Sequence, residues 1–120
     1  MLRFRLHTLL LFTTLVAILV CAIFRWWPID GISGNLSSLL SNEDTVWAPG
    51  YSDNRFKAVE QGMLRDEVHR LLGPPFGSES FQGGLWENWT FSPRDGDYHE
   101  RTVIFVNGRV ARKVGQFWID

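Results

Sequence analysis

The chain has 120 residues, of which 45% are hydrophobic, and its 12 basic and 13 acidic residues give a net charge of -1. This balance provides no electropositive surface of the kind that DNA or RNA binding requires, so nucleic acid is not an expected partner. The single cysteine excludes an intrachain disulfide and a cysteine-based zinc site.

The first element in chain order is an apolar run from Leu9 to Phe24. It approaches the roughly 20 residues that cross a bilayer as a helix. Arg3 and Arg5 precede the run and two tryptophans follow it, a pattern typical of a cytoplasmic basic end and an interfacial aromatic belt. We predict an uncleaved, single-pass transmembrane anchor over residues 1–27, with the N-terminus in the cytoplasm and the C-terminal domain extracytoplasmic. A cleaved signal peptide and a buried core helix are the alternatives.

The next segment, residues 28–54, is rich in Ser, Gly, Asn and Asp and contains acidic residues but no Lys or Arg. Such a composition predicts a flexible acidic linker, in which Leu36, Leu39 and Leu40 could form a brief helical patch. The linker would connect the anchor to a small domain formed by residues 55–120.

Two short helices are predicted at the start of that domain. Leu64, Val68, Leu71 and Leu72 recur at the spacing that places apolar side chains on one helix face. Gly73 and the two prolines after it end this helix, because glycine tolerates a left-handed position and proline cannot continue the hydrogen-bond ladder. An earlier glycine separates it from a first helical segment that contains FKAVEQ.

Strand-forming residues follow, with alternating apolar side chains. Four strands are predicted: Ser78–Gln82, Leu85–Phe91, Tyr98–Val106 and Arg109–Trp118. We therefore expect an α+β fold in which two short helices pack on a three- to four-stranded antiparallel sheet, after an N-terminal transmembrane helix.

Two glycine-containing pairs, Gly83-Gly84 and Asn107-Gly108, are suited to tight hairpin turns because both tolerate positive φ. The Asn-Gly turn sets a register in which Phe105 lies opposite Val110 and Val103 lies opposite Arg112. We expect these pairs to face the helices.

These motifs resemble the SmpA/OmlA small lipoproteins, the BamE-like proteins of the outer-membrane β-barrel assembly machinery. The resemblance covers roughly residues 56–113, and its motifs are mostly structural. The matching positions are Gly62, Met63, Glu67, Val68, Leu71, Leu72, Gly73, Pro75, Trp89, Phe91, Phe105, Gly108 and Val110.

The resemblance implies a two-helix, three-strand type of domain with no active site, and another envelope protein as the partner. Two positions depart from the family pattern. Leu64 stands where a Thr or Ser usually caps the helix. Val20, which is bulky, precedes Cys21 and argues against lipidation of that cysteine.

Catalytic and metal-binding groups are sparse in the sequence. His69 and His99 are separate histidines next to charged neighbours, and Ser78 and Ser80 have no obvious His and Asp partners. The DGD sequence at residues 95–97 lacks the remaining ligands of a calcium loop. We expect neither an enzyme nor a metal or other cofactor site.

A binding role is suggested by exposed aromatic and basic residues, which dominate protein interfaces. The alternative is that the aromatic side chains pack under the linker or lie at the membrane surface. The sequence thus predicts a non-catalytic, membrane-anchored, extracytoplasmic scaffold or protein-binding module, and the resemblance implies a role in envelope or outer-membrane protein assembly. The alternative function is an inhibitor-like domain that binds and occludes a hydrolase. The candidate partner-binding residues are Trp86, Arg101, Arg109, Arg112, Lys113, Phe117 and Trp118.

Overall fold

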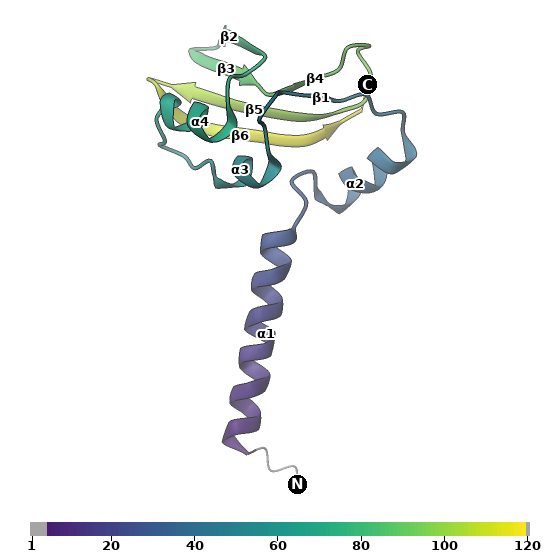
Figure 1. Ribbon diagram of the computed structural model, residues 1–120, viewed down its shortest axis with the longest axis vertical. Helices are drawn as coiled ribbons and strands as arrows, with labels where there is room; N and C mark the ends of the chain where they lie inside the picture. Colours follow the sequence, from purple (N-terminus) through teal and green to yellow (C-terminus); the bar gives the residue numbers. More distant parts are fainter. Residues whose placement is uncertain (1–4, 120) are drawn as a thin grey trace.

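The computed structural model describes residues 5–119 and divides into a long N-terminal helix and an α+β body (Figure 1). Helix α1, Leu6–Trp26, is long and apolar enough to cross a membrane, by length and composition. None of its residues is buried in the rest of the protein. Arg3, one of the two arginines on which the predicted orientation depends, lies outside the described residues.

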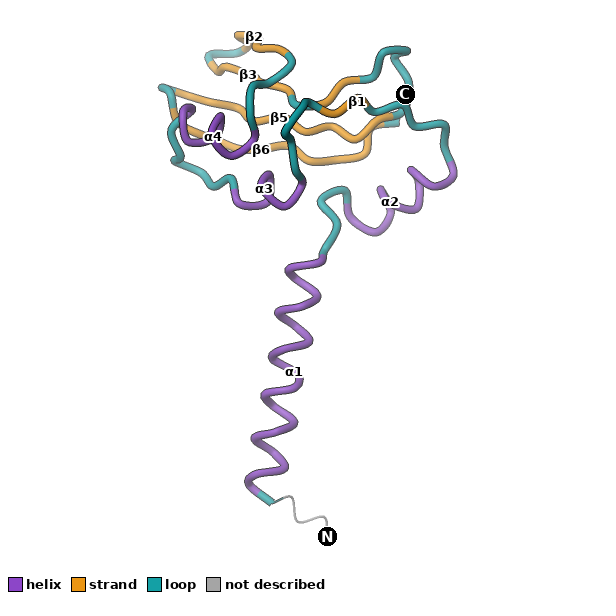
Figure 2. The backbone as a smooth tube through the Cα atoms, in the orientation of Figure 1, coloured by secondary structure: helices purple, strands orange, loops and turns teal. Residues whose placement is uncertain are grey.

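The body contains an antiparallel sheet with the strand order β2-β3-β5-β6. Its strands are β2 Gly77–Phe81, β3 Gly84–Asn88, β5 Tyr98–Val106 and β6 Arg109–Trp118. Two short strands, β1 Val46–Trp47 and β4 Thr90–Phe91, pair beside it (Figure 2). Helices α3, Asp53–Ala58, and α4, Arg65–Leu72, supply the core on one face of the sheet. The predicted α+β fold with an N-terminal apolar helix is confirmed.

The core forms where α3 and α4 meet this face. Phe56, Val68 and Leu72 from the helical region pack with Val103 and Phe105 of β5, and all of them are buried. Burial of each such side chain contributes about 1.5–3 kcal/mol relative to exposure. Of the helix face predicted from periodicity, Val68 and Leu72 are buried, whereas Leu64 is 43% exposed. Val103 and Phe105 face the helices as predicted.

The two ends of α4 agree with the sequence. Leu64 is the N-cap and makes no side-chain capping hydrogen bond. Gly73 ends the helix with φ 77°, a conformation that glycine adopts without a Cβ clash.

The predicted strand Leu85–Phe91 is interrupted at Trp89. This tryptophan is fully buried, and its indole Nε1 donates a hydrogen bond to the Gly73 carbonyl at 3.0 Å. The preceding hairpin turn lies one residue earlier than predicted, at Gln82-Gly83, with φ values of 49° and 78°. Gly84 is already the first residue of β3.

One of the two cross-strand pairs predicted for the last hairpin is observed. Phe105 lies opposite Val110, but Val103 lies opposite Lys113, and Arg112 instead lies opposite Ile104. The cause is an irregularity of the ladder between Ile104 and Phe105, a β-bulge that shifts the pairing by one residue. Because strand side chains alternate between faces, this shift moves Arg112 to the face away from the helices.

The segment 28–54 is not the expected flexible tether. It contains helix α2, Gly31–Leu40, and strand β1, and Ala48 is buried in the core. Ile29 lies over Gly115 of β6, where a Cβ atom would collide with the isoleucine side chain. Ala48 packs in the core and Ile29 against it, and Asp30 and Asp53 bind Arg101 of β5, so these contacts hold the segment on the body.

Candidate binding face

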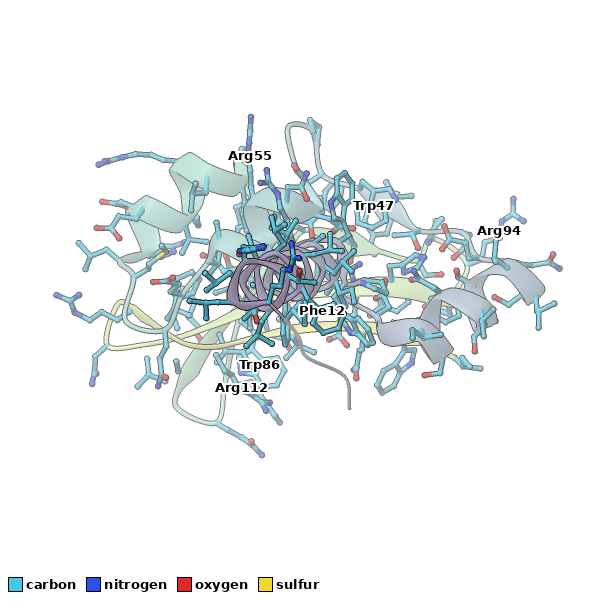
Figure 3. All side chains as sticks on the ribbon, turned by 90° about the horizontal axis from the view of Figure 1, so that it is seen from below. Phe12, Trp47, Arg55, Trp86, Arg94 and Arg112 are labelled. Carbon is cyan, nitrogen blue, oxygen red and sulfur yellow. The ribbon has the colours of Figure 1, made fainter. Side chains whose placement is uncertain are left out.

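The candidate binding face is the side of the sheet opposite α3 and α4. The register aligns one residue from each strand in a row across this side. In strand order, the row is Glu79, Trp86, Ile104 and Arg112. Figure 3 shows Trp86 and Arg112 next to each other, on the other side of the sheet from α3 and α4. We call this surface the open face.

The middle of the open face is aromatic and positively charged. The Arg112 guanidinium lies 6.0 Å from the centroid of the Trp86 ring, and Phe81 meets the same ring edge-on at 5.8 Å. Ile104 lies beneath and is only 6% exposed. No ion pair found within residues 5–119 includes Arg112. This arginine is therefore available to an acidic group from outside.

The open face continues to the end of β6. Trp118 lies opposite Tyr98 and is 50% exposed. Beside it, a cavity of about 300 Å³ is lined by Tyr98, Trp118 and the turn after β4. The surface thus combines an exposed tryptophan, a stacked Arg-Trp pair and a cavity. Tryptophan and arginine dominate the binding energy of many protein interfaces, often in or beside such pockets.

The other predicted partner-binding residues point elsewhere. Arg109 donates to the Gly62 carbonyl at 2.9 Å, at the start of the α4 region. The Lys113 ammonium donates to the carbonyls of Phe56 and Lys57, at 2.9 and 3.0 Å. Phe117 packs against the His99 ring, with 4.9 Å between centroids. Of the seven residues, Trp86, Arg112 and Trp118 lie on the open face, with Arg112 stacked on Trp86 and Trp118 at the far end of β6.

Arg101, predicted as a surface residue, is only 1% exposed. Its Nη1 and Nη2 donate to the two carboxylate oxygens of Asp30 at 2.7 and 2.9 Å, and its Nε donates to Asp53 at 3.0 Å. The guanidinium also lies 5.5 Å from the Trp47 ring centroid. Arg101 therefore has a structural role, since it binds Asp30 and Asp53 of the segment 28–54. Arg101, Asp30, Asp53 and His99 form what we call the clasp.

Electrostatics of the clasp favour its charged form. Burial alone would raise the pKa of Asp30, but hydrogen bonds from His99 and Arg101 outweigh it and hold this pKa well below its usual value. His99 bonds Asp30 through Nδ1 at 2.8 Å and contacts Glu43 through Nε2 at 2.7 Å. The bond to Asp30 raises the pKa of His99. Because Asp30 follows α1 closely, the clasp fixes the body to the end of that helix.

Sequence reasoning missed the clasp, although one signal was present. The segment 28–54 carries acidic residues and no bases, whereas β5 has an arginine at an alternating position that faces the helices. A basic residue on the core side of a central strand requires an acidic partner. That requirement points to the acidic segment as the source of the partner.

A second buried carboxylate, Glu87 of β3, has no exposed surface. It accepts hydrogen bonds from Arg65 at 2.9 and 3.1 Å and from Ser78 at 2.6 Å, and it lies 2.7 Å from His69 Nε2. Burial would raise the pKa of Glu87, but these bonds lower it. Ser78 and His69 both bond the carboxylate, so the histidine is not placed to take the serine proton. This cluster is suited to holding α4 on the sheet.

Within residues 5–119, no group of three or more His, Cys, Asp and Glu side chains could hold a metal ion. Comparison with known proteins found no matching family model, no matching curated protein and no matching solved structure. The open face and the attachment of the body to α1 are therefore the features that indicate a function.

Proposed function

We propose that this protein is a non-catalytic, membrane-anchored binding module that engages another protein through the open face. The observation that carries the proposal is the stack of the exposed Arg112 on the half-buried Trp86, with Trp118 exposed on the same side of the sheet. Trp and Arg are the side chains most enriched among residues that dominate binding energy. The face lies on rigid strands, so little order has to be gained on binding.

The proposal places α1 across a membrane and the body on its extracytoplasmic side. The apolar length of α1 supports the first part, and the basic residue Arg5 before it supports the second. The resemblance to SmpA/OmlA proteins supports another envelope protein as the partner. A reporter fused after Asp120 tests this topology, since activity of that reporter in the cytoplasm alone would exclude it.

The clasp supports the same function in a mechanical sense. It connects the end of α1 to β5 through Asp30 and Arg101, so the open face is held at a defined height above the end of the helix. The face would thereby be directed sideways, along the membrane (Figures 1 and 3). A partner anchored in the same membrane can reach it without bending the chain.

A photo-crosslinking amino acid at position 86 tests the interface in intact membranes. We expect a defined adduct with one protein partner. In the full-length chain without the crosslinker, the double variant Trp86→Ala/Arg112→Ala should release that partner faster, because most interface mutations act on the dissociation rate. Binding should survive a chelator.

The matched control is Arg70→Ala, which removes an exposed arginine from α4 on the opposite side. It should leave the adduct and the dissociation rate unchanged. If both variants retained the partner equally well, the open face would not be the binding surface.

A further inference from the structure

Helix α2 has an apolar side that no other part of the described protein covers. Ile32 is 57% exposed and Leu36 56% exposed, and the values for Leu39 and Leu40 are 81% and 89%. These residues follow the helical spacing i, i+4, i+7 and i+8, so they share one face. Four large aliphatic side chains on a ten-residue helix form a continuous apolar stripe.

The opposite side of α2 is docked on the sheet. Gly34 lies against Phe117 of β6, where an added Cβ would come within 3.3 Å of the phenylalanine Cβ. Ser37 and Ser38 are half-buried on the same side. The small residues thus face the protein and the large apolar residues face away, which is the reverse of a core-packing helix. Since the docked side is fixed by β6, the stripe cannot turn inward.

The position of α2 indicates what the stripe meets. In Figure 1, α2 runs sideways from the end of α1 and lies below the sheet, on the side of the body from which α1 emerges. Trp26 and Trp27, at the end of α1, are 80% and 48% exposed. Tryptophans at this position of a membrane helix mark the level of the lipid headgroups. The stripe therefore lies close to that level.

The surface between α1 and the body is apolar as well. A groove of about 640 Å³ is lined there by Ile23, Phe24, Trp27, Ile29 and Phe56, among others. It lies between the apolar surface of α1 and Pro28 and Ile29, the residues that lead into α2. This continuity distinguishes the stripe from an isolated apolar patch, because one neighbour, the bilayer surface, can cover α1, the groove and the stripe together.

We propose that α2 is an interfacial helix whose stripe, Ile32, Leu36, Leu39 and Leu40, is inserted into the lipid headgroup region beside α1. The inference goes beyond protein binding and depends on the proposed membrane anchoring of α1. Helix α2 has no charged residue, so burial of apolar area drives its insertion, without help from anionic lipid. The body then has two attachments to the membrane, which restrict its rotation about α1.

The test uses spin labels on the full-length chain in phosphatidylcholine vesicles. A Cys21→Ser background carries a single new cysteine from Leu39→Cys in the stripe. Two reference labels come from Leu15→Cys in α1 and Ser80→Cys on β2, the strand farthest from α1 (Figure 1). Collision rates with oxygen, which enriches in lipid, and with a water-soluble nickel complex place each label in lipid, in water or inside protein.

We expect the label at position 39 to collide more with oxygen and less with the nickel complex than the label at position 80. Both of its collision rates should lie between those of the labels at positions 80 and 15. The same result is expected when phosphatidylglycerol is added to the vesicles. Leu36→Cys provides a second position on the stripe if Leu39→Cys does not fold.

A label at position 39 that behaves like position 80, with position 15 in lipid, would overturn the interfacial helix and leave the anchor intact. Low collision rates with both reagents would place the stripe under protein, such as a second copy, and would also overturn it. If position 15 were exposed to nickel as well, the anchoring itself would be refuted, and the inference with it.

Discussion

Replacement of Arg101 by Met is the sharpest test of the clasp. The substitution keeps an apolar stem of similar length in the core but removes the charge that faces Asp30 and Asp53. The Asp30 side chain is 5% exposed, so water cannot replace the lost partner, whereas Asp53 is 45% exposed and can be hydrated. Breaking one side of a buried ion pair costs about 3–5 kcal/mol. Because His99 still bonds Asp30, we expect the lower end, about 3 kcal/mol.

The measurement is the free energy of unfolding of the body, from urea titration of the full-length chain in detergent micelles, with tryptophan fluorescence as the signal. A loss of about 3 kcal/mol is a large share of the stability of a small domain, which is about 5–15 kcal/mol. Arg112→Met is the matched control on the open face. Its cost should stay within about 0.5 kcal/mol, since it removes an exposed side chain without an ion pair.

The double variant Asp30→Asn/Arg101→Met distinguishes the cost of leaving Asp30 without its partner from the other effects of replacing Arg101. Neutralising both partners removes the uncompensated buried charge, so the double variant should be more stable than Arg101→Met alone. A cost of Arg101→Met no larger than that of Arg112→Met would contradict the buried ion pair. So would a double variant whose cost equals the sum of the costs of Asp30→Asn and Arg101→Met measured singly.

Two further predictions concern the core and the pH dependence. Phe105→Ala and Leu72→Ala should each lower the free energy of unfolding by about 2–5 kcal/mol, measured in the same titration, because both side chains are buried between α4 and the sheet; an unchanged urea midpoint would contradict the packing described. The bond to Asp30 raises the pKa of His99 above its ordinary 6.5. The contribution of protonated His99 to the free energy of unfolding is therefore fully present below pH 6.5, and it is lost as the pH rises through the folded-state pKa. His99 also faces Glu43 and Arg101, between the rings of Trp47 and Phe117. His99→Asn should therefore flatten the decline of the urea midpoint as the pH rises above about 6.5, and an unaltered slope would exclude His99 as its source.

The parts of the fold predicted from the sequence are those controlled by local pattern. The periodic leucines of α4, the Gly73 stop and the Asn107-Gly108 turn specify their conformations within a few residues. Strands β5 and β6 were predicted with their observed bounds, because alternation is clear in both. The break at Trp89 was not, since it depends on a hydrogen bond to Gly73, which is distant in the sequence.

The candidate site was harder to predict because it depends on register. A one-residue shift at Ile104 and Phe105 decides whether Arg112 faces the helices or the open side. Composition alone cannot distinguish the buried Arg101 from the exposed Arg112, since both are arginines in strands whose side chains alternate between the two faces of the sheet. Burial of Arg101 follows from its long-range pairing with Asp30, across 71 positions of the chain.

The direction of the open-face row bears on what can bind there. Its acidic end, Glu79, is on β2, the strand farthest from α1, and its basic end, Arg112, is on β6, the strand nearest to α1 (Figure 1). Two copies anchored in one membrane and related by a two-fold axis along the membrane normal would meet at equal heights. Arg112 would then face Arg112, and Glu79 would face Glu79, an arrangement that like-charge repulsion disfavours. The proposed face therefore favours a different protein, with an acidic group near the membrane and a basic group farther out.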